Sequence, residues 1–387
     1  MSTLFRQYSV LKWILTVLAV LIFLLMLSSP SSIVFIKRFT ESEMFVEGDL
    51  LTQGKPALQV RNVQPPKQHI YYLKTHKTAS TTIYSILAEY CRAHELVPLL
   101  PVGVHINQRP PFHPSQLMLH HKVSKYDMVF NHHIYTEEIL RYLHNDTFTF
   151  TTIRDPFKHF ISSFSYFSKF NLTYLTEIKS KNKLDALLEN PEQYETKGYS
   201  SYTNNRQSLD LGFDIKHKFN DSTYIKEFIS LTEKRFQLVL ITDYFYESLI
   251  LLKRALNWQT GDILFYKKQE NKDSSLLLNS ATDKQRKQHE LFSTADIQVY
   301  KYFLQIFKFK ISKERDIEGE VAEFQTVLSR VHTFCDRDLP SNSQFMLETG
   351  RWSDRIDLQH SKCKWLKLDE VQFTKYLQNV QRSLFES

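Results

Sequence analysis

The feature that most constrains the fold is an alternation of short apolar segments with amphipathic helical patterns, which begins near residue 69. The apolar segments are typical of buried strands and cover residues 69–73, 148–153 and 237–241. Helical spacing of apolar residues follows each strand, with the helix after the third strand at about 245–256, and another helix is predicted over 223–234. This alternation predicts an α/β fold, with a central parallel sheet flanked by helices, in one domain over residues 69–387.

The N-terminus carries a long apolar run. Residues 13–27 hold no charge, and residues 33–36 extend the run to a length that can cross a bilayer. We predict a cytoplasmic tail over 1–12, an uncleaved signal-anchor helix over 13–36 and a stem over 37–68. A cleaved signal peptide is the alternative, because residues 28–32 are small. The anchor predicts a single-pass type II membrane protein with a lumenal domain.

Sequons and cysteines agree with a lumenal domain. Asn145, Asn171 and Asn220 each begin an Asn-X-Ser/Thr triplet, and behind an anchor they are predicted glycosylation sites. The three cysteines are too few for a disulfide-built fold. A bond between Cys335 and Cys363 is plausible, with Cys91 buried on its helix.

The charge balance points to an anionic ligand. Lysine and arginine exceed aspartate and glutamate by 49 − 42 = 7, which gives a formal net charge of +7. The basic residues are not clustered into an arm or tail, so nucleic-acid binding is not expected.

The first candidate site is the segment Lys-Thr-His-Lys-Thr-Ala-Ser-Thr-Thr at 74–82, between a predicted strand and a predicted helix. Ligands in open α/β sheets bind at the carboxyl ends of strands, and a helix N-terminus favours phosphate. No glycine occurs between Gly54 and Gly103, which excludes a Walker A loop and a Gly-x-Gly-x-x-Gly turn. A capped helix start with a solvated Lys77 is the structural alternative.

The second candidate site follows the strand at 148–153. Arg154 stands at the strand end, and Asp155 and Pro156 are suited to begin a helix. A guanidinium in this place can bind a second phosphate through paired hydrogen bonds. A structural pair of Arg154 with Asp155, and a packing role for Ser162, are the alternatives.

Together the two segments resemble the sulfotransferases. Lys-Thr-Ala-Ser-Thr-Thr after the first strand is similar to their 5′-phosphosulfate loop, and Arg-Asp-Pro, with Ser eight positions after the Arg, is similar to their 3′-phosphate motif. Several sequence segments resemble the galactose-3-O-sulfotransferases more closely, and these matches run in order from about residue 70 to 268. They are the first loop, the pair His132-His133, and the segments 145–148, 163–167, 209–213 and 241–249.

This resemblance implies a P-loop-like sulfotransferase fold, a Golgi location and a donor, 3′-phosphoadenosine 5′-phosphosulfate (PAPS). It implies transfer of the sulfuryl group to the 3-hydroxyl of a terminal galactose on a glycolipid, such as galactosylceramide, or on a glycan. Ala79 stands where cytosolic sulfotransferases usually have glycine. The donor-binding residues implied are Lys74, Thr75, Lys77, Thr78, Ala79, Ser80, Thr81, Thr82, Arg154 and Ser162.

Sulfuryl transfer requires stabilisation of the leaving oxygen and a base for the acceptor hydroxyl. Lys77 is predicted to neutralise the leaving group. Histidine suits the base, and a cationic neighbour would keep His76 neutral. His133, or its neighbour His132, is the second candidate, and the sequence leaves the choice of base open. No metal is expected.

Two other functions remain open from sequence. A Golgi sulfotransferase for the 2-O or 6-O positions of glycosaminoglycans would share both PAPS motifs, although its long polyanionic acceptor favours a more basic surface. A membrane-anchored protein that binds PAP or glycans without catalysis would require decay of the motifs, whereas Lys77, Arg154 and Ser162 are all present.

Overall fold

The computed structural model describes residues 64–106, 109–170, 173–196, 198–266 and 272–385. The chain divides into the units Met1–Asn62 and Val63–Ser387, and the fold described is that of the second unit. The predicted tail and anchor, and all of the predicted stem up to residue 63, lie outside the described residues. Within the described ranges, none of the helices has both the length and the apolar character needed to cross a bilayer.

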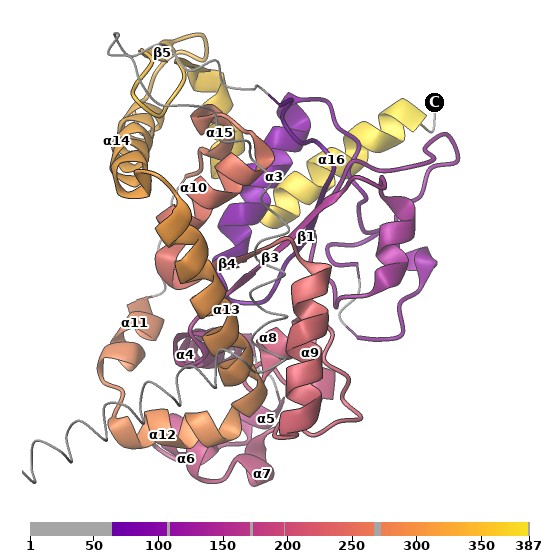
Figure 1. Cartoon of the computed structure of the whole chain (residues 1–387), viewed down its shortest axis with the longest axis vertical. Helices are drawn as coiled ribbons and strands as arrows, with labels where there is room; N and C mark the ends of the chain where they lie inside the picture. Colours follow the sequence, from indigo (N-terminus) through magenta and orange to yellow (C-terminus); the bar gives the residue numbers. More distant parts are fainter. Residues whose placement is uncertain (1–63, 107–108, 171–172, 197, 267–271, 386–387) are drawn as a thin grey trace, which may run out of the picture. The chain divides into compact units, whose positions relative to one another are not determined.

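A four-stranded parallel sheet with the order β2-β1-β3-β4 forms the centre of the fold (Figure 1). Its strands are β1 (Ile70–Leu73), β2 (Met128–Val129), β3 (Phe148–Ile153) and β4 (Leu238–Ile241). Three of them confirm the predicted strands, while β2 has only two residues and is too short to show a periodic pattern. Because all strands run the same way, the ends of β1, β3 and β4 lie along one edge of the sheet.

Helices flank the sheet, as the alternation predicts. Three of them directly follow the strands that end at the site: α3 (Ser80–Ala93) after β1, α4 (Pro156–Phe167) after β3 and α10 (Phe245–Leu256) after β4. The predicted start of α4 is confirmed, because Pro156 is its first residue and the carboxylate of Asp155 accepts a hydrogen bond from the Lys158 amide at 2.9 Å. Burial of both sheet faces explains why β1 and β4 read as continuous apolar runs, whereas β3 carries three threonines among its apolar residues.

The other α-helices lie around the sheet, and several of them form the lower part of the molecule in the view of Figure 1. Between α4 and β4 the described residues form five α-helices, α5 (Thr173–Thr176), α6 (Lys183–Glu189), α7 (Pro191–Tyr194), α8 (Arg206–Asp210) and α9 (Ser222–Arg235). After α10 follow α11 (Lys272–Asn279), α12 (Asp283–Phe292), α13 (Thr294–Lys313), α14 (Ile317–Cys335), α15 (His360–Lys367) and α16 (Glu370–Phe385). A small antiparallel pair, β5 (Gln344–Leu347) and β6 (Ile356–Gln359), separates α14 from α15.

The C-terminal helix returns to the start of the domain. Figure 1 shows α16 beside α3, and the hydroxyls of Tyr84 and Thr374 join the two helices through a buried hydrogen bond of 2.7 Å. A disulfide links Cys335 at the end of α14 to Cys363 on α15, which is the pairing judged plausible from sequence. Cys91 is a buried free thiol on α3, as expected. The hydrogen bond between Tyr84 and Thr374 thus helps to hold α16 against α3, the helix that follows the first candidate loop.

The sequons fall on accessible chain where the structure describes them. Asn145 and Asn220 are both exposed, which glycosylation requires. Asn171 lies outside the described residues. Glycosylation of the three asparagines stays a prediction.

Candidate active site

The loop between β1 and α3 has an unusual backbone. Lys77 and Ala79 both adopt left-handed conformations, with φ of 57° and 55°. Ala79 is the N-cap residue of α3, yet no side chain caps the helix and its first turn holds no acidic residue. The first N–H groups of α3 are therefore left for a ligand, and the helix dipole favours an anion there.

Threonines fasten this loop to the ends of the neighbouring strands. The Thr75 hydroxyl donates to the carbonyl of Thr152 at 2.5 Å, and the hydroxyls of Thr78 and Thr152 are 2.9 Å apart. The Thr242 hydroxyl donates to the carbonyl of Thr78 at 3.0 Å. Thr75 and Thr78 are fully buried. The structure thus places these two predicted donor-binding side chains behind the loop, where they hold its shape.

The second predicted segment meets the first at the edge of the sheet. Arg154 follows β3, and its Nη1 atom donates to the carbonyl of Lys77 at 3.2 Å. The amide of Arg154 donates to the side chain of Gln207 on α8 at 2.7 Å. Ser162 lies on α4 and, with Arg154 and Lys77, lines one cavity. The two strand–loop–helix units therefore face the same space, as a shared ligand requires.

This cavity has a volume of about 460 Å³, within the range of small-molecule sites. Seven of the predicted donor-binding residues line it: Lys74, Lys77, Ala79, Ser80, Thr81, Arg154 and Ser162. Thr82 does not, although it lies in the first turn of α3. The remaining lining includes one histidine and two tyrosines, His132, Tyr166 and Tyr202.

Positive charge is concentrated in the cavity. Burial, together with the charges of Arg154 and Lys74, lowers the pKa of Lys77 to about 8. The Lys77 ammonium lies 3.7 Å from the centroid of the Tyr166 ring, a favourable cation–π contact. A bound polyanion would relieve the repulsion among the three cations, so the electrostatics of the cavity fit a phosphosulfate donor.

His76 is held by a buried carboxylate. Asp210, at the end of α8, accepts hydrogen bonds from the backbone amide of His76 at 2.7 Å and from its Nδ1 atom at 2.8 Å. Arg206, also fully buried, pairs with Asp210 at 2.8 Å. Although burial opposes it, the charge of Arg206 and the hydrogen bonds from His76 lower the pKa of Asp210 to about 2. Asp210 is therefore ionised and fixes the proton of His76 on Nδ1.

The other ring nitrogen of His76, Nε2, takes no part in the contact with Asp210. Burial lowers the pKa of His76 to about 4, against the opposing effect of Asp210, so the ring is neutral at neutral pH. Among the described residues no group hydrogen-bonds to its Nε2 atom, and His76 lines the cavity. A neutral imidazole with a lone pair on Nε2 is suited to accept a proton.

The structure separates the two other candidate histidines. His132 lines the cavity and its ring stacks on that of His76, with centroids 4.3 Å apart. The ammonium of Lys74 donates to His132 Nε2 at 2.6 Å. His133 is absent from the lining, and both its ring nitrogens are engaged, with the Asn131 carbonyl and the Tyr71 hydroxyl, each at 2.8 Å. Both ring nitrogens of His132 are engaged as well, because its Nδ1 atom lies 2.9 Å from the Lys74 carbonyl, so the two histidines differ in that only His132 lines the cavity.

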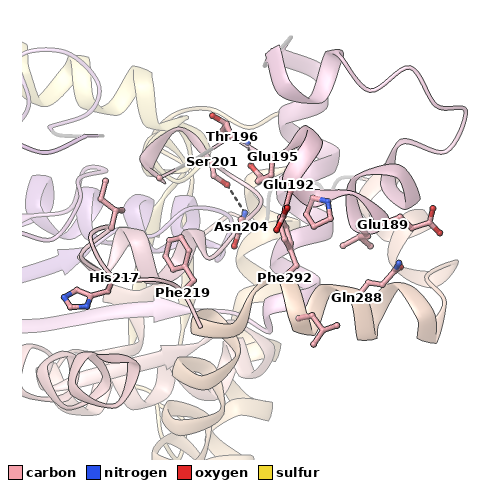
Figure 2. Close-up of a pocket in the computed structure, with 15 residues that line it drawn as sticks. Glu189, Glu192, Glu195, Thr196, Ser201, Asn204, His217, Phe219, Gln288 and Phe292 are labelled. Carbon is pink, nitrogen blue, oxygen red and sulfur yellow. Dashed lines mark hydrogen bonds between the residues drawn. The ribbon is translucent and has the colours of Figure 1, made fainter. Parts of the chain in front are cut away.

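A second, larger cavity of about 950 Å³ lies elsewhere in the domain and is not lined by any predicted site residue. Figure 2 shows three carboxylates around it, Glu189, Glu192 and Glu195, with Phe219 and Phe292. Burial raises the pKa of Glu195 to about 7. Because carboxylates repel a polyanion, size alone does not make this cavity the donor site.

Sequence reasoning missed two groups of the site. Asp210 lies in the string Leu209-Asp-Leu-Gly-Phe, which carried part of the family resemblance, so a signal for it existed. Glu370 lines the cavity from α16 and pairs with Lys74 at 2.9 Å. No local pattern singles out this glutamate, because it enters the site only through the packing of α16 on α3.

Comparison with known proteins agrees with this geometry. The family model described as galactose-3-O-sulfotransferase matches residues 1–346, most of the chain. The chain belongs to the galactose-3-O-sulfotransferase family. This membership confirms the predicted family and enzyme class, and favours the predicted function over the glycosaminoglycan and non-catalytic alternatives.

Individual relatives of the family are moderately similar. Galactose-3-O-sulfotransferase 2 of Mus musculus is 30% identical over 292 residues, which are 71% of each chain. Galactosylceramide sulfotransferase of Mus musculus is 32% identical over 278 residues, 70% of this chain and 64% of the relative. Galactose-3-O-sulfotransferase 3 of Homo sapiens is 28% identical over 353 residues, 84% of this chain and 80% of the relative. One of these names gives galactosylceramide and the other two give only galactose, so the similarities do not select one acceptor.

Proposed function

We propose that this protein transfers the sulfuryl group of PAPS to the 3-hydroxyl of a terminal galactose on a glycolipid or a glycan. The observation that carries the proposal is the single cavity into which Lys77, Arg154 and the uncapped start of α3 converge. A donor with phosphate at both ends requires two separate anion sites at one sheet edge. The family resemblance supplies the identity of the donor and of the acceptor sugar.

The donor is held by both strand–loop–helix units. The α3 N-terminus, with Ser80 and Thr81, binds the 5′-phosphosulfate, and Lys77 lies nearest the oxygen that bridges phosphorus and sulfur. Arg154 and Ser162 bind the 3′-phosphate. Thr75 and Thr78 act through the loop, which they anchor to β3 and β4. This arrangement resembles other phosphate sites in which backbone N–H groups supply most of the contacts.

Acceptor activation is assigned to His76. Its Nε2 atom takes the proton of the galactose 3-hydroxyl as the oxygen forms its bond to sulfur, and Asp210 stabilises the resulting imidazolium. A pKa of about 4 makes free His76 a weak base. The negative charge of a bound donor raises that pKa, so the base becomes effective only when the donor is present.

Departure of the leaving group is assigned to Lys77. As the bond between sulfur and the bridging oxygen breaks, the electron pair stays on that oxygen, which becomes part of the 5′-phosphate. The Lys77 ammonium neutralises this charge at the position where it develops. Sulfuryl transfer thus depends on positioning and charge, as phosphoryl transfer does.

The N-terminal run and the sequons support a Golgi protein with its catalytic domain in the lumen. A signal anchor over 13–36 and a stem over 37–68 would hold the domain near membrane-bound acceptors, as a glycolipid substrate requires. Protease protection of sealed microsomes tests this topology, since only residues before the anchor should be digested.

The function is tested with the full-length chain purified in a mild detergent. Incubation with PAPS and a β-galactoside should yield galactose sulfated at position 3, identified by mass spectrometry and NMR. Lys77→Ala and Arg154→Ala should each abolish transfer with the circular dichroism spectrum unchanged. Lys169→Ala, which removes an exposed lysine, is the matched control. Near-normal turnover by Lys77→Ala would refute the leaving-group assignment.

A further inference from the structure

Gln207 on α8 holds the backbone of Arg154 through both of its polar groups. Arg154 stands between the end of β3 and the start of α4, so its backbone lies outside regular secondary structure. Its N–H group donates to Gln207 Oε1 at 2.7 Å, and its carbonyl accepts from Gln207 Nε2 at 3.0 Å. Gln207 is itself buried, with 2% of its surface exposed. One buried side-chain amide therefore pairs with both backbone groups of this arginine.

The same short helix also holds the first donor-binding segment. Three residues after Gln207, the carboxylate of Asp210 accepts the backbone N–H of His76 at 2.7 Å. Residues three apart lie on the same face of a helix. The five residues of α8 thus contact the backbone of both the segment 74–82 and Arg154. The separation of the two proposed phosphate sites therefore depends on this helix.

Asp296 on α13 fixes α8 in turn. Its carboxylate accepts hydrogen bonds from the amides of Gln207 at 3.2 Å and Ser208 at 2.7 Å, and from the Ser208 hydroxyl at 2.6 Å. The amide of Asp296 donates to Asn205 Oδ1 at 3.0 Å. All four residues are buried. Buried hydrogen-bond networks make the local structure rigid when their members are paired, so the Gln207 amide is a fixed support for Arg154.

The backbone of Arg154 determines where its guanidinium can reach. A guanidinium binds phosphate through a rigid planar fork, so its geometry tolerates little displacement or rotation. We propose that Gln207 is a positioning residue that orients Arg154, and that it thereby gives the protein its selectivity for a nucleotide with a 3′-phosphate over one without it. This inference rests on the proposed function, in which Arg154 binds the 3′-phosphate, and adds a specificity-determining residue to it.

Nucleotide binding in the absence of an acceptor tests the inference. Calorimetry on the full-length chain gives the Kd of adenosine 3′,5′-bisphosphate (PAP) and of 5′-AMP, which lacks only the 3′-phosphate. The ratio of the second Kd to the first should be on the order of 100 in the wild type, as expected for charge-assisted hydrogen bonds to one phosphate. Gln207→Met, which has a similar length but neither amide group, should lower this ratio about 10-fold, with the Kd of 5′-AMP changed less than about 2-fold.

Two comparisons separate positioning from general damage. Arg154→Ala should bring the ratio close to 1, and adding Gln207→Met to it should lower the ratio no further, because the glutamine acts through the arginine. Gln378→Met is the matched control and should leave the ratio unchanged. Gln378 is also buried, and its Nε2 atom donates to the carbonyls of Pro101 at 2.7 Å and Gly103 at 2.8 Å. If Gln207→Met does not fold, Gln207→Asn, whose amide is too short to reach both backbone groups, should lower the ratio instead.

The outcomes distinguish this inference from the proposed function. A wild type that prefers PAP, together with folded Gln207 variants that prefer it equally, would overturn the role of Gln207 alone. An equal weakening of PAP and 5′-AMP would also overturn it, because Gln207 would then support the whole cavity. A wild type that binds PAP no more tightly than 5′-AMP would overturn the donor assignment and this inference together. The expected fall in the ratio, in a protein that sulfates no galactoside, would support this inference and overturn the proposed transfer.

Discussion

Lys77 provides the sharpest test of the mechanism, because its pKa of about 8 lies within the range of ordinary assays. The ammonium is the active form, so activity falls as pH rises through this value. The protonated fraction is about nine-tenths at pH 7 and about one-tenth at pH 9, and kcat/KM for PAPS should therefore fall about 10-fold between them. The phosphate of the donor titrates near pH 6 and leaves this window clear.

The assay is the initial rate of transfer at low PAPS and saturating β-galactoside, from pH 5.5 to 9.5, because kcat/KM reports the groups of the free enzyme. On the acid side only the titration of the donor phosphate near pH 6 should appear, since the pKa of His76 is about 4. Lys77→Arg keeps the charge at every pH tested, and its lower rate should show no decline between pH 7 and 9. A decline near pH 8 that persists in Lys77→Arg would refute the assignment of Lys77.

Three further predictions concern the neighbours of this lysine. Asp210→Asn should abolish transfer and lower the free energy of unfolding by about 3–5 kcal/mol, because Arg206 keeps a buried charge without its partner; denaturant unfolding measures this, and wild-type stability would contradict it. His132→Ala should reduce turnover, whereas His133→Ala should mainly cost about 1–3 kcal/mol of stability; the opposite pattern in parallel rate and unfolding assays would exchange their roles. Ala79→Gly should stabilise the protein by up to about 1 kcal/mol with transfer retained, by relief of the left-handed backbone; a lower Tm would show that the methyl group is needed.

Local patterns predicted three of the central strands, the helices that follow them and the two segments of the proposed donor site. The strands at 148–153 and 237–241, and the helix that Asp155 begins, were readable because burial and capping act over a few neighbouring residues. The lysine loop and Arg154 were readable for the same reason, since each lies directly after a strand. A two-residue strand such as β2 has no periodicity to detect.

Only the tertiary structure shows which further groups lie beside the proposed reaction site. The sequence left His76, His132 and His133 open as bases, and the choice depends on Asp210, which reaches His76 from 134 residues further along the chain. Glu370 enters the cavity because α16 packs on α3. Contacts of this kind leave no local pattern, because the chain's own packing, rather than the spacing of neighbouring residues, brings the two side chains together.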